Sequence, residues 1–163
     1  MKPKNGQVEI LGIYTDWCLE NAKKRVIKLI NILLETKLSR EEILAIVERS
    51  YPKITKYFKP GERGVPEVEL HNTIQARLSG IEDMVGEENP HGEYDWDNNK
   101  IYLYLPRMIS VEQIIRSLIH EYIHSTQDIE QMEKNRELGY DNDPFEREAH
   151  KAEDQWEKFV WLN

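Results

Sequence analysis

The stretch that decides how this chain folds and what it can bind is His120-Glu121-Tyr122-Ile123-His124, which has two histidines four residues apart and a glutamate beside the first. On an α-helix, residues i and i+4 lie on the same face, so both imidazoles can reach one metal ion. Glu121 then lies on the flank of that face, next to the ion. The pattern needs a helix and a third ligand, because without them both histidines are ordinary hydrogen-bonded residues.

The residues before the motif predict the required helix. Ser110 and Gln113 form a capping-box pattern, and Pro106 ends the strand-like run that precedes it. Apolar residues at spacings of three and four form a stripe that would face a core: Val111, Ile114, Ile115, Leu118, Ile119, Tyr122 and Ile123. The two histidines border this stripe, so we expect them at the edge of the core.

A second predicted helix offers the third ligand. Asp143 is a suitable N-cap and Pro144 a suitable first residue for a helix that runs towards Trp161. Glu146 and His150 share one face of that helix. Catalytic zinc sites use three protein ligands and leave one position for water.

The motif and the helix that follows it resemble a known group of zinc peptidases. His120-Glu121-x-x-His124 followed by Glu146-x-x-Ala149-His150 resembles the gluzincin pattern, in which a later helix adds a glutamate ligand to HExxH. The stretch 143–149, Asp-Pro-Phe-Glu-Arg-Glu-Ala, is similar to the N/D-P-F-E-x-E-A box of small gluzincin-like peptidases, many of them encoded by phages and bacteria. The resemblance covers roughly the last third of the chain.

The resemblance implies a role for each matched residue. His120, His124 and Glu146 would be zinc ligands, and Glu121 the general base that takes a proton from a metal-activated water. His150 stands where the family usually has Asp or Asn, whose side chain supports a histidine ligand. His150 and Glu148 are therefore predicted to support the ligands.

The residues alone leave the third ligand open. Glu146 could instead complete a capping box with Asp143. Glu148 lies about 200° around the helix from Glu146, so only one of the two can face the metal ion. His150 is the remaining alternative. Two imidazoles and a carboxylate suit zinc best, although iron, cobalt, nickel or manganese could use the same ligands.

Composition bounds the other possibilities. The single cysteine, Cys18, excludes a Cys-rich structural zinc site and an intramolecular disulfide. With a net charge of −8, the chain is not expected to bind nucleic acid. No signal-peptide pattern is found, and the apolar stretch Val26–Leu34 is too short to span a bilayer. We therefore predict that the protein does not associate with a membrane. Its predicted location is the cytoplasm of the producing cell or, if a phage encodes it, of the host.

The predicted fold class is α+β and zincin-like: a small antiparallel sheet beside the HExxH helix and the third-ligand helix, with N-terminal helices packed on it. One domain over residues 1–163 is expected, made of a helical block (1–58), a sheet (66–106) and the metal-site helices (110–163). Within these blocks the pattern predicts helices over 15–37 and from Ser39 to Pro52, a linker over 59–66, a strand over Val68–Leu78, a loop over 80–92, and strands over 93–96 and 101–105.

The resemblance therefore implies a zinc-dependent endopeptidase that acts on peptides or proteins. The substrate would lie against an edge strand, either Ile101–Leu105 or its neighbour. Tyr140 and His91 are candidate donors to the oxyanion of the transition state. The alternative is an inactive zincin-like protein that binds a metal ion and, through its helical block, a partner; a helical binding module without metal is a third reading. The oligomeric state is left open.

Overall fold

The computed structural model describes residues 22–24, 38–80 and 90–161. The chain divides into two units, residues 1–36 and residues 37–161. In the first unit the described residues 22–24 are helical, while Cys18 and the rest of the helix predicted over 15–37 lie outside the described residues. The prediction of one domain over 1–163 stays a prediction for the same reason.

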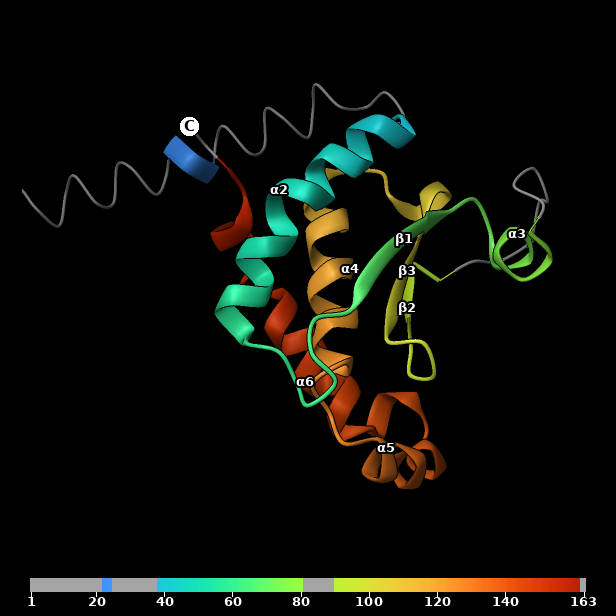
Figure 1. Cartoon of the computed structure of the whole chain (residues 1–163). Helices are drawn as coiled ribbons and strands as arrows, with labels where there is room; N and C mark the ends of the chain where they lie inside the picture. The colour runs from blue at the N-terminus through green and yellow to red at the C-terminus, as the bar shows by residue number, and fades with distance from the viewer. Residues whose placement is uncertain (1–21, 25–37, 81–89, 162–163) are drawn as a thin grey trace, which may run out of the picture. The chain divides into compact units, whose positions relative to one another are not determined.

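The second unit combines helices with one small sheet, so the predicted α+β class is confirmed (Figure 1). No helix in its described part, or in residues 22–24, is long and apolar enough to cross a membrane. In chain order its elements are α2 (Arg40–Phe58), β1 (Glu67–His71), α3 (Ile74–Ser79), β2 (Gly92–Asp95), β3 (Lys100–Tyr104), α4 (Val111–His124), α5 (Ile129–Asn135) and α6 (Pro144–Glu153), with short 3-10 turns at Leu105–Arg107, Arg136–Leu138, Tyr140–Asn142 and Trp156–Phe159.

The sheet has the order β1-β3-β2, with β3 in the centre. The hairpin of β2 and β3 is antiparallel and lies within one residue of the two predicted strands. β1, however, runs parallel to β3, so the prediction of a purely antiparallel sheet is wrong. Parallel neighbours need a crossover connection between them, and here α3 lies in the segment that joins β1 to the hairpin.

The predicted strand over Val68–Leu78 is wrong in its second half, which forms α3. Thr73 caps this helix, since its hydroxyl accepts a hydrogen bond from the backbone N–H of Ala76 at 2.9 Å. Gly80 ends it at a φ of 70°, a left-handed conformation that favours glycine. The alternation of apolar residues suggested a strand with one buried face, but Leu78, which belongs to that alternation, is 72% exposed.

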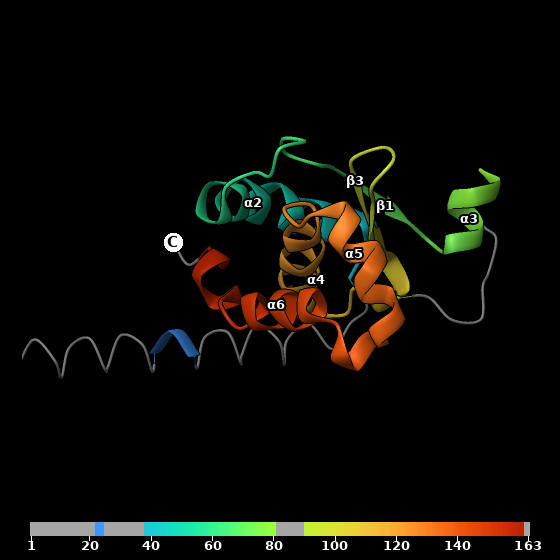
Figure 2. The same cartoon turned by 90° about the horizontal axis from the view of Figure 1, so that it is seen from below.

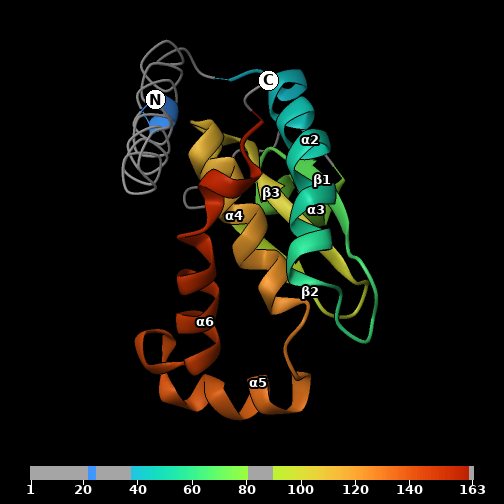
Figure 3. The ribbon, with the colours of Figure 1, turned by 90° about the vertical axis from the view of Figure 1, so that its left-hand side faces the viewer.

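α4 forms the centre of the core. It contacts α2, α6 and the sheet, as Figures 2 and 3 show, and Ile114, Ile115, Leu118, Ile119 and Tyr122 have no exposed surface. The predicted apolar stripe is thus buried, and each such side chain contributes about 1.5–3 kcal/mol to folding. At the start of the helix, the hydroxyl of Ser110 accepts from the N–H of Gln113 at 3.1 Å, but the Gln113 side chain donates to Ser117 and does not close the predicted capping box.

α2 covers α4 on the side away from α6. Its capping box is formed as predicted, with Ser39 and Glu42 bonded in both directions. The predicted end near Pro52 is wrong, because the helix continues to Phe58. A proline inside a helix costs about 3 kcal/mol. Packing on α4 offsets this cost, since Ile54 is fully buried and the ring of Tyr51 lies 5.9 Å from that of Tyr122.

Candidate metal centre

Three potential ligand side chains meet where α4 crosses α6. Nε2 of His120 lies 3.0 Å from Nε2 of His124, and the two nitrogens lie 3.3 and 3.4 Å from the two carboxylate oxygens of Glu146. Ligand atoms at about 2.0–2.1 Å from a tetrahedral zinc ion are separated by about 3.3 Å. The cluster therefore has the size of a zinc site, although a bound ion requires the two imidazoles to move slightly apart.

The carboxylate of Glu146 also fits a metal ligand. It does not complete the capping box that the sequence allowed, because the backbone N–H of Asp143 donates to the carbonyl of Tyr140 at 3.2 Å. Its Oε2 atom is buried and has no hydrogen-bond partner. A buried carboxylate oxygen without a partner is costly, and a cation would remove that cost.

Each histidine is oriented by a hydrogen bond at its other nitrogen. Nδ1 of His120 lies 2.7 Å from Oε1 of Glu153, and Nδ1 of His124 lies 2.8 Å from Oε1 of Gln127. Both partners are acceptors, so the hydrogen-bond network assigns a proton to each Nδ1 and directs the Nε2 atoms at the cluster, where their lone pairs can bind a metal ion once it displaces the Nε2 protons. Metal-binding histidines are commonly fixed in this way.

Glu153 and Gln127 were not predicted from the sequence. Glu153 lies seven residues after Glu146, two helical turns along the same face of α6, and this spacing is the signal that could have identified it. Gln127 follows α4 in a turn, and no periodicity points to it. The predicted supporting residue Glu148 acts one step further out, because its carboxylate accepts from Gln127 at 2.9 Å and does not reach the cluster.

His150 supports the site through Glu153 rather than by direct hydrogen bonding to a ligand histidine. Its Nδ1 lies 2.9 Å from Oε1 of Glu153, and its Nε2 lies 3.1 Å from the hydroxyl of Tyr140. Atoms of His120, His150 and Glu153 also lie close enough to hold a cation. This second group supports the cluster rather than forming a metal site of its own. Glu153 already accepts hydrogen bonds from His120 and His150, and the side chain of His150 is half exposed.

The electrostatics of the cluster favour positive charge. Burial lowers the pKa of His120, but the adjacent carboxylates of Glu146 and Glu153 outweigh it and raise the pKa to about 10. Burial raises the pKa of Glu146, yet the two histidines hold it well below its usual range. The carboxylates therefore stabilise cations at this point, and a metal ion that binds here must displace protons.

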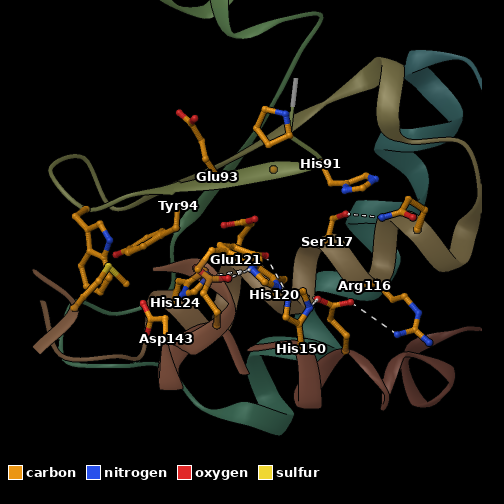
Figure 4. A pocket seen from close by; sticks show the side chains of 18 residues that line it. His91, Glu93, Tyr94, Arg116, Ser117, His120, Glu121, His124, Asp143 and His150 are labelled. Carbon is orange, nitrogen blue, oxygen red and sulfur yellow. Dashed lines mark hydrogen bonds and ion pairs between the residues drawn. The ribbon is translucent and has the colours of Figure 1, made fainter. Parts of the chain in front are cut away.

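Glu121 lies beside the cluster, beneath β2, as Figure 4 shows. It is only 7% exposed, and burial raises its pKa to about 7. A Cβ atom at Gly92 would lie 3.0 Å from Cγ of Glu121 and 3.0 Å from the carbonyl oxygen of Tyr102, so any larger residue would push against Glu121 or the backbone of β3. Glu121 is thus held between the strand and the imidazoles without being one of the three clustered ligands.

A cleft of about 640 Å³ opens over the cluster between β2, α4 and α6, and both predicted oxyanion donors, Tyr140 and His91, line it. Of the two strands predicted to hold a substrate, β3 is excluded because it is paired on both sides. Of its two neighbours, which are both edge strands, β2 borders the cleft.

The first variant to test concerns the carboxylate behind His120. Glu153→Gln keeps the shape of the side chain and removes its charge, so His120 becomes a weaker base and a less firmly oriented ligand. We expect zinc affinity, measured by competition with a chromogenic chelator, to fall about 10- to 100-fold. Asp154→Asn is the matched control, because this neighbour is exposed and its carboxylate pairs with Arg116 at 3.5 Å. Equal effects of both changes would exclude a specific role for Glu153.

Comparison of the chain with protein-family models, with curated proteins and with solved structures found no match. The fold and the site together define an α+β protein with a candidate two-histidine, one-glutamate metal centre at the bottom of a cleft. What this centre does must therefore be argued from its own geometry.

Proposed function

We propose that this chain is a zincin-like zinc metallopeptidase of the minimal gluzincin type. The observation that carries the proposal is the position of Glu121, a buried carboxylate beside the cluster of His120, His124 and Glu146 and directly beneath an edge strand. A purely structural metal site has no need of an acidic group next to its ligands. A hydrolytic site needs one as a general base.

The donor set suits a catalytic ion. His120, His124 and Glu146 supply three protein ligands, the number that leaves a further position for water or substrate. Zinc held there would supply Lewis-acid chemistry, lowering the pKa of water and polarising a carbonyl group. Glu153 and Gln127 accept from Nδ1 of the two histidines, so the protons that a metal ion displaces are those on Nε2, and the imidazoles that remain are neutral, the form that binds zinc.

The protein's own residues then account for the proton transfers of peptide hydrolysis. Glu121 takes a proton from the attacking water as the water oxygen bonds to the carbonyl carbon of the peptide. The same carboxylate gives this proton to the amide nitrogen as the C–N bond breaks, so that a carboxylic acid and an amine leave. The buried position of Glu121 keeps this carboxylate out of bulk water.

β2 offers main-chain groups for an extended peptide. The carbonyl of His91 accepts from the N–H of Tyr104, which identifies this pair as hydrogen-bonded in the antiparallel ladder. Hydrogen-bonded and non-hydrogen-bonded pairs alternate, so Glu93 also faces β3, whereas Gly92 and Tyr94 direct their N–H and C=O groups to the open edge. These groups can pair with a substrate in strand conformation, the mode of recognition known as β-augmentation.

Tyr140 is the better candidate for the oxyanion donor. Burial and the nearby Glu146 raise its pKa to about 12, so the hydroxyl stays protonated near neutral pH. Tyr140→Phe should lower kcat for peptide hydrolysis about a hundredfold, the usual effect of losing one such donor, and leave zinc content unchanged. His91→Gln should have a smaller effect. The reverse order would assign the role to His91.

Metal content and hydrolysis, measured on the same preparation, test the proposal as a whole. Elemental mass spectrometry should find about one zinc per chain. A pool of unstructured peptides should be cleaved, a chelator should stop the cleavage, and added zinc should restore it. Zinc without cleavage would favour the inactive metal-binding alternative, and no zinc after reconstitution would overturn both readings.

A further inference from the structure

The two ends of the cleft differ in chemistry. Towards the C-terminus of β2 the lining includes Tyr94 and Trp96, whose rings are in contact, and α5 adds the thioether of Met132 to the lining of the same cleft. At the other end α4 contributes Gln113, Arg116 and Ser117. Figure 4 shows this separation, with Tyr94 on one side of Glu121 and with Ser117 and Arg116 on the other.

The apolar end is preformed. Tyr94 lies in β2 and Trp96 in the turn that follows it, and their ring centroids are 4.8 Å apart at an angle of 70°. The hydroxyl of Tyr94 donates to Asn99 at 2.7 Å, which satisfies its polar group away from the metal cluster. Met132 is partly exposed. A thioether and two aromatic rings make an adaptable surface for apolar side chains.

The opposite end is polar, and the positive charge of Arg116 there is already balanced by neighbouring carboxylates. The guanidinium of Arg116 donates to Glu112 at 2.9 Å and lies 3.5 Å from Asp154 and 3.8 Å from Glu153. Ser117 accepts from the side chain of Gln113 at 3.3 Å. This end therefore offers little apolar surface, and it has no strong net charge with which to select a charged side chain.

The distance from the metal cluster fixes which substrate residue meets the apolar end. Gly92 overlies Glu121, so the bond to be cut lies opposite Gly92. Tyr94 lies two residues further along β2, about 7 Å away, and Trp96 follows in the turn after the strand, with its ring against that of Tyr94. A substrate peptide that pairs antiparallel to β2, the more stable arrangement, runs from Trp96 towards Gly92. The substrate residues on the N-terminal side of the bond that is cut then lie over Tyr94 and Trp96.

We propose that Tyr94, Trp96 and Met132 form a subsite for an apolar or aromatic side chain of the substrate, located one to three residues before the bond that is cut. This inference rests on the proposed peptidase function and adds its substrate class: peptides with a large apolar residue on the N-terminal side of the cleavage point.

The cleavage pattern is the first test. Zinc-loaded protein is incubated with a pool of peptides of diverse sequence, and the products are sequenced by mass spectrometry. Leu, Met, Phe, Tyr or Trp should be enriched within three residues before the cut, with kcat/KM about tenfold higher than for Lys or Glu at the same position. A flat pattern, or enrichment only after the cut, would overturn the proposed subsite.

Two variants connect the preference to these residues. Met132→Glu places a charge in the subsite and should abolish the preference for apolar residues. Ile129→Glu is the control, since Ile129 is on the same helix, is 45% exposed and does not line the cleft, so it should leave the preference intact. Trp96→Ala should reduce the preference without adding charge, which separates loss of the subsite from damage to α5. An unchanged preference in both subsite variants would refute the assignment.

Binding without turnover separates failure of the subsite from failure of the proposed function. Zinc-loaded Glu121→Gln is titrated with fluorescent peptides that differ only in Leu or Lys at the preferred position. The Leu peptide should bind about tenfold more tightly, and Met132→Glu should remove the difference. Equal binding overturns the subsite even if the wild-type protein cleaves peptides. A difference in binding without any cleavage by the wild type would overturn the peptidase function alone.

Discussion

Replacing Glu121 by glutamine is expected to lower kcat for peptide hydrolysis by about a thousandfold while the zinc content stays at its wild-type value. Glutamine has nearly the same shape and can fill the space between Gly92 and the imidazoles. It cannot take a proton from water or give one to the leaving amine. Because Glu121 is not among the three clustered ligand atoms, its change should not release the metal ion.

The same variant should fold at least as well as the wild type. Burial disfavours the charged form of Glu121, which is the reason for its raised pKa, and a neutral amide avoids that cost. Thermal unfolding checks this point. Glu112→Gln, on the same helix but at the surface, is the control and should retain full activity. Turnover by Glu121→Gln would exclude the proposed mechanism, and loss of zinc would make Glu121 a ligand instead.

The elements predicted well are those specified by local signals. The period of apolar residues between Val111 and Ile123 predicted α4, and Asp143 with Pro144 predicted the start of α6, although this helix ends at Glu153 and does not run on towards Trp161. Both signals act within one or two helical turns, so they need no knowledge of the rest of the chain. The hairpin of β2 and β3 was equally local, because a turn between two strands fixes their pairing.

The errors arose where distant contacts overrule local preference. Pro52 is a helix-ending signal, yet α2 continues because its later residues, such as Ile54, are buried against the core. The alternation after Val68 suggested one long strand, but the caps at Thr73 and Gly80 make a helix of its second half. The parallel pairing of β1 with β3 depends on contacts between residues more than thirty positions apart, about which local patterns carry no information.

The site shows the same division. The spacing of His120 and His124 defines their common face locally, whereas the choice among Glu146, Glu148 and His150 depends on how α6 crosses α4. The structure brings Glu146 to the histidines, leaves Glu148 at Gln127, and turns His150 towards Glu153 and Tyr140. The role of Glu146 as a ligand stays a proposal, and it can be tested directly.

Glu146→Ala is expected to weaken zinc binding more than about a hundredfold, beyond the effect of losing a supporting hydrogen bond. It removes one of three protein ligands and leaves two imidazoles, which hold zinc far less tightly. Glu148→Ala is a close control, because it deletes the same side chain two residues along α6. Its carboxylate contacts Gln127, which orients His124, so zinc affinity should fall by less than about tenfold. Zinc dissociation constants from chelator competition give both values.

The comparison is informative only if both variants are folded, and the chain provides a reason to check this. Glu146 lies in the first turn of α6, where a negative charge stabilises the helix by about 0.3–1 kcal/mol, a contribution that Glu146→Ala loses. Circular dichroism and thermal unfolding in the presence of a chelator measure that loss apart from the metal. A variant that is folded without metal and still binds zinc as tightly as the wild type would remove Glu146 from the ligand set. If Glu148→Ala lost zinc instead, the crossing of α4 and α6 described here would be wrong.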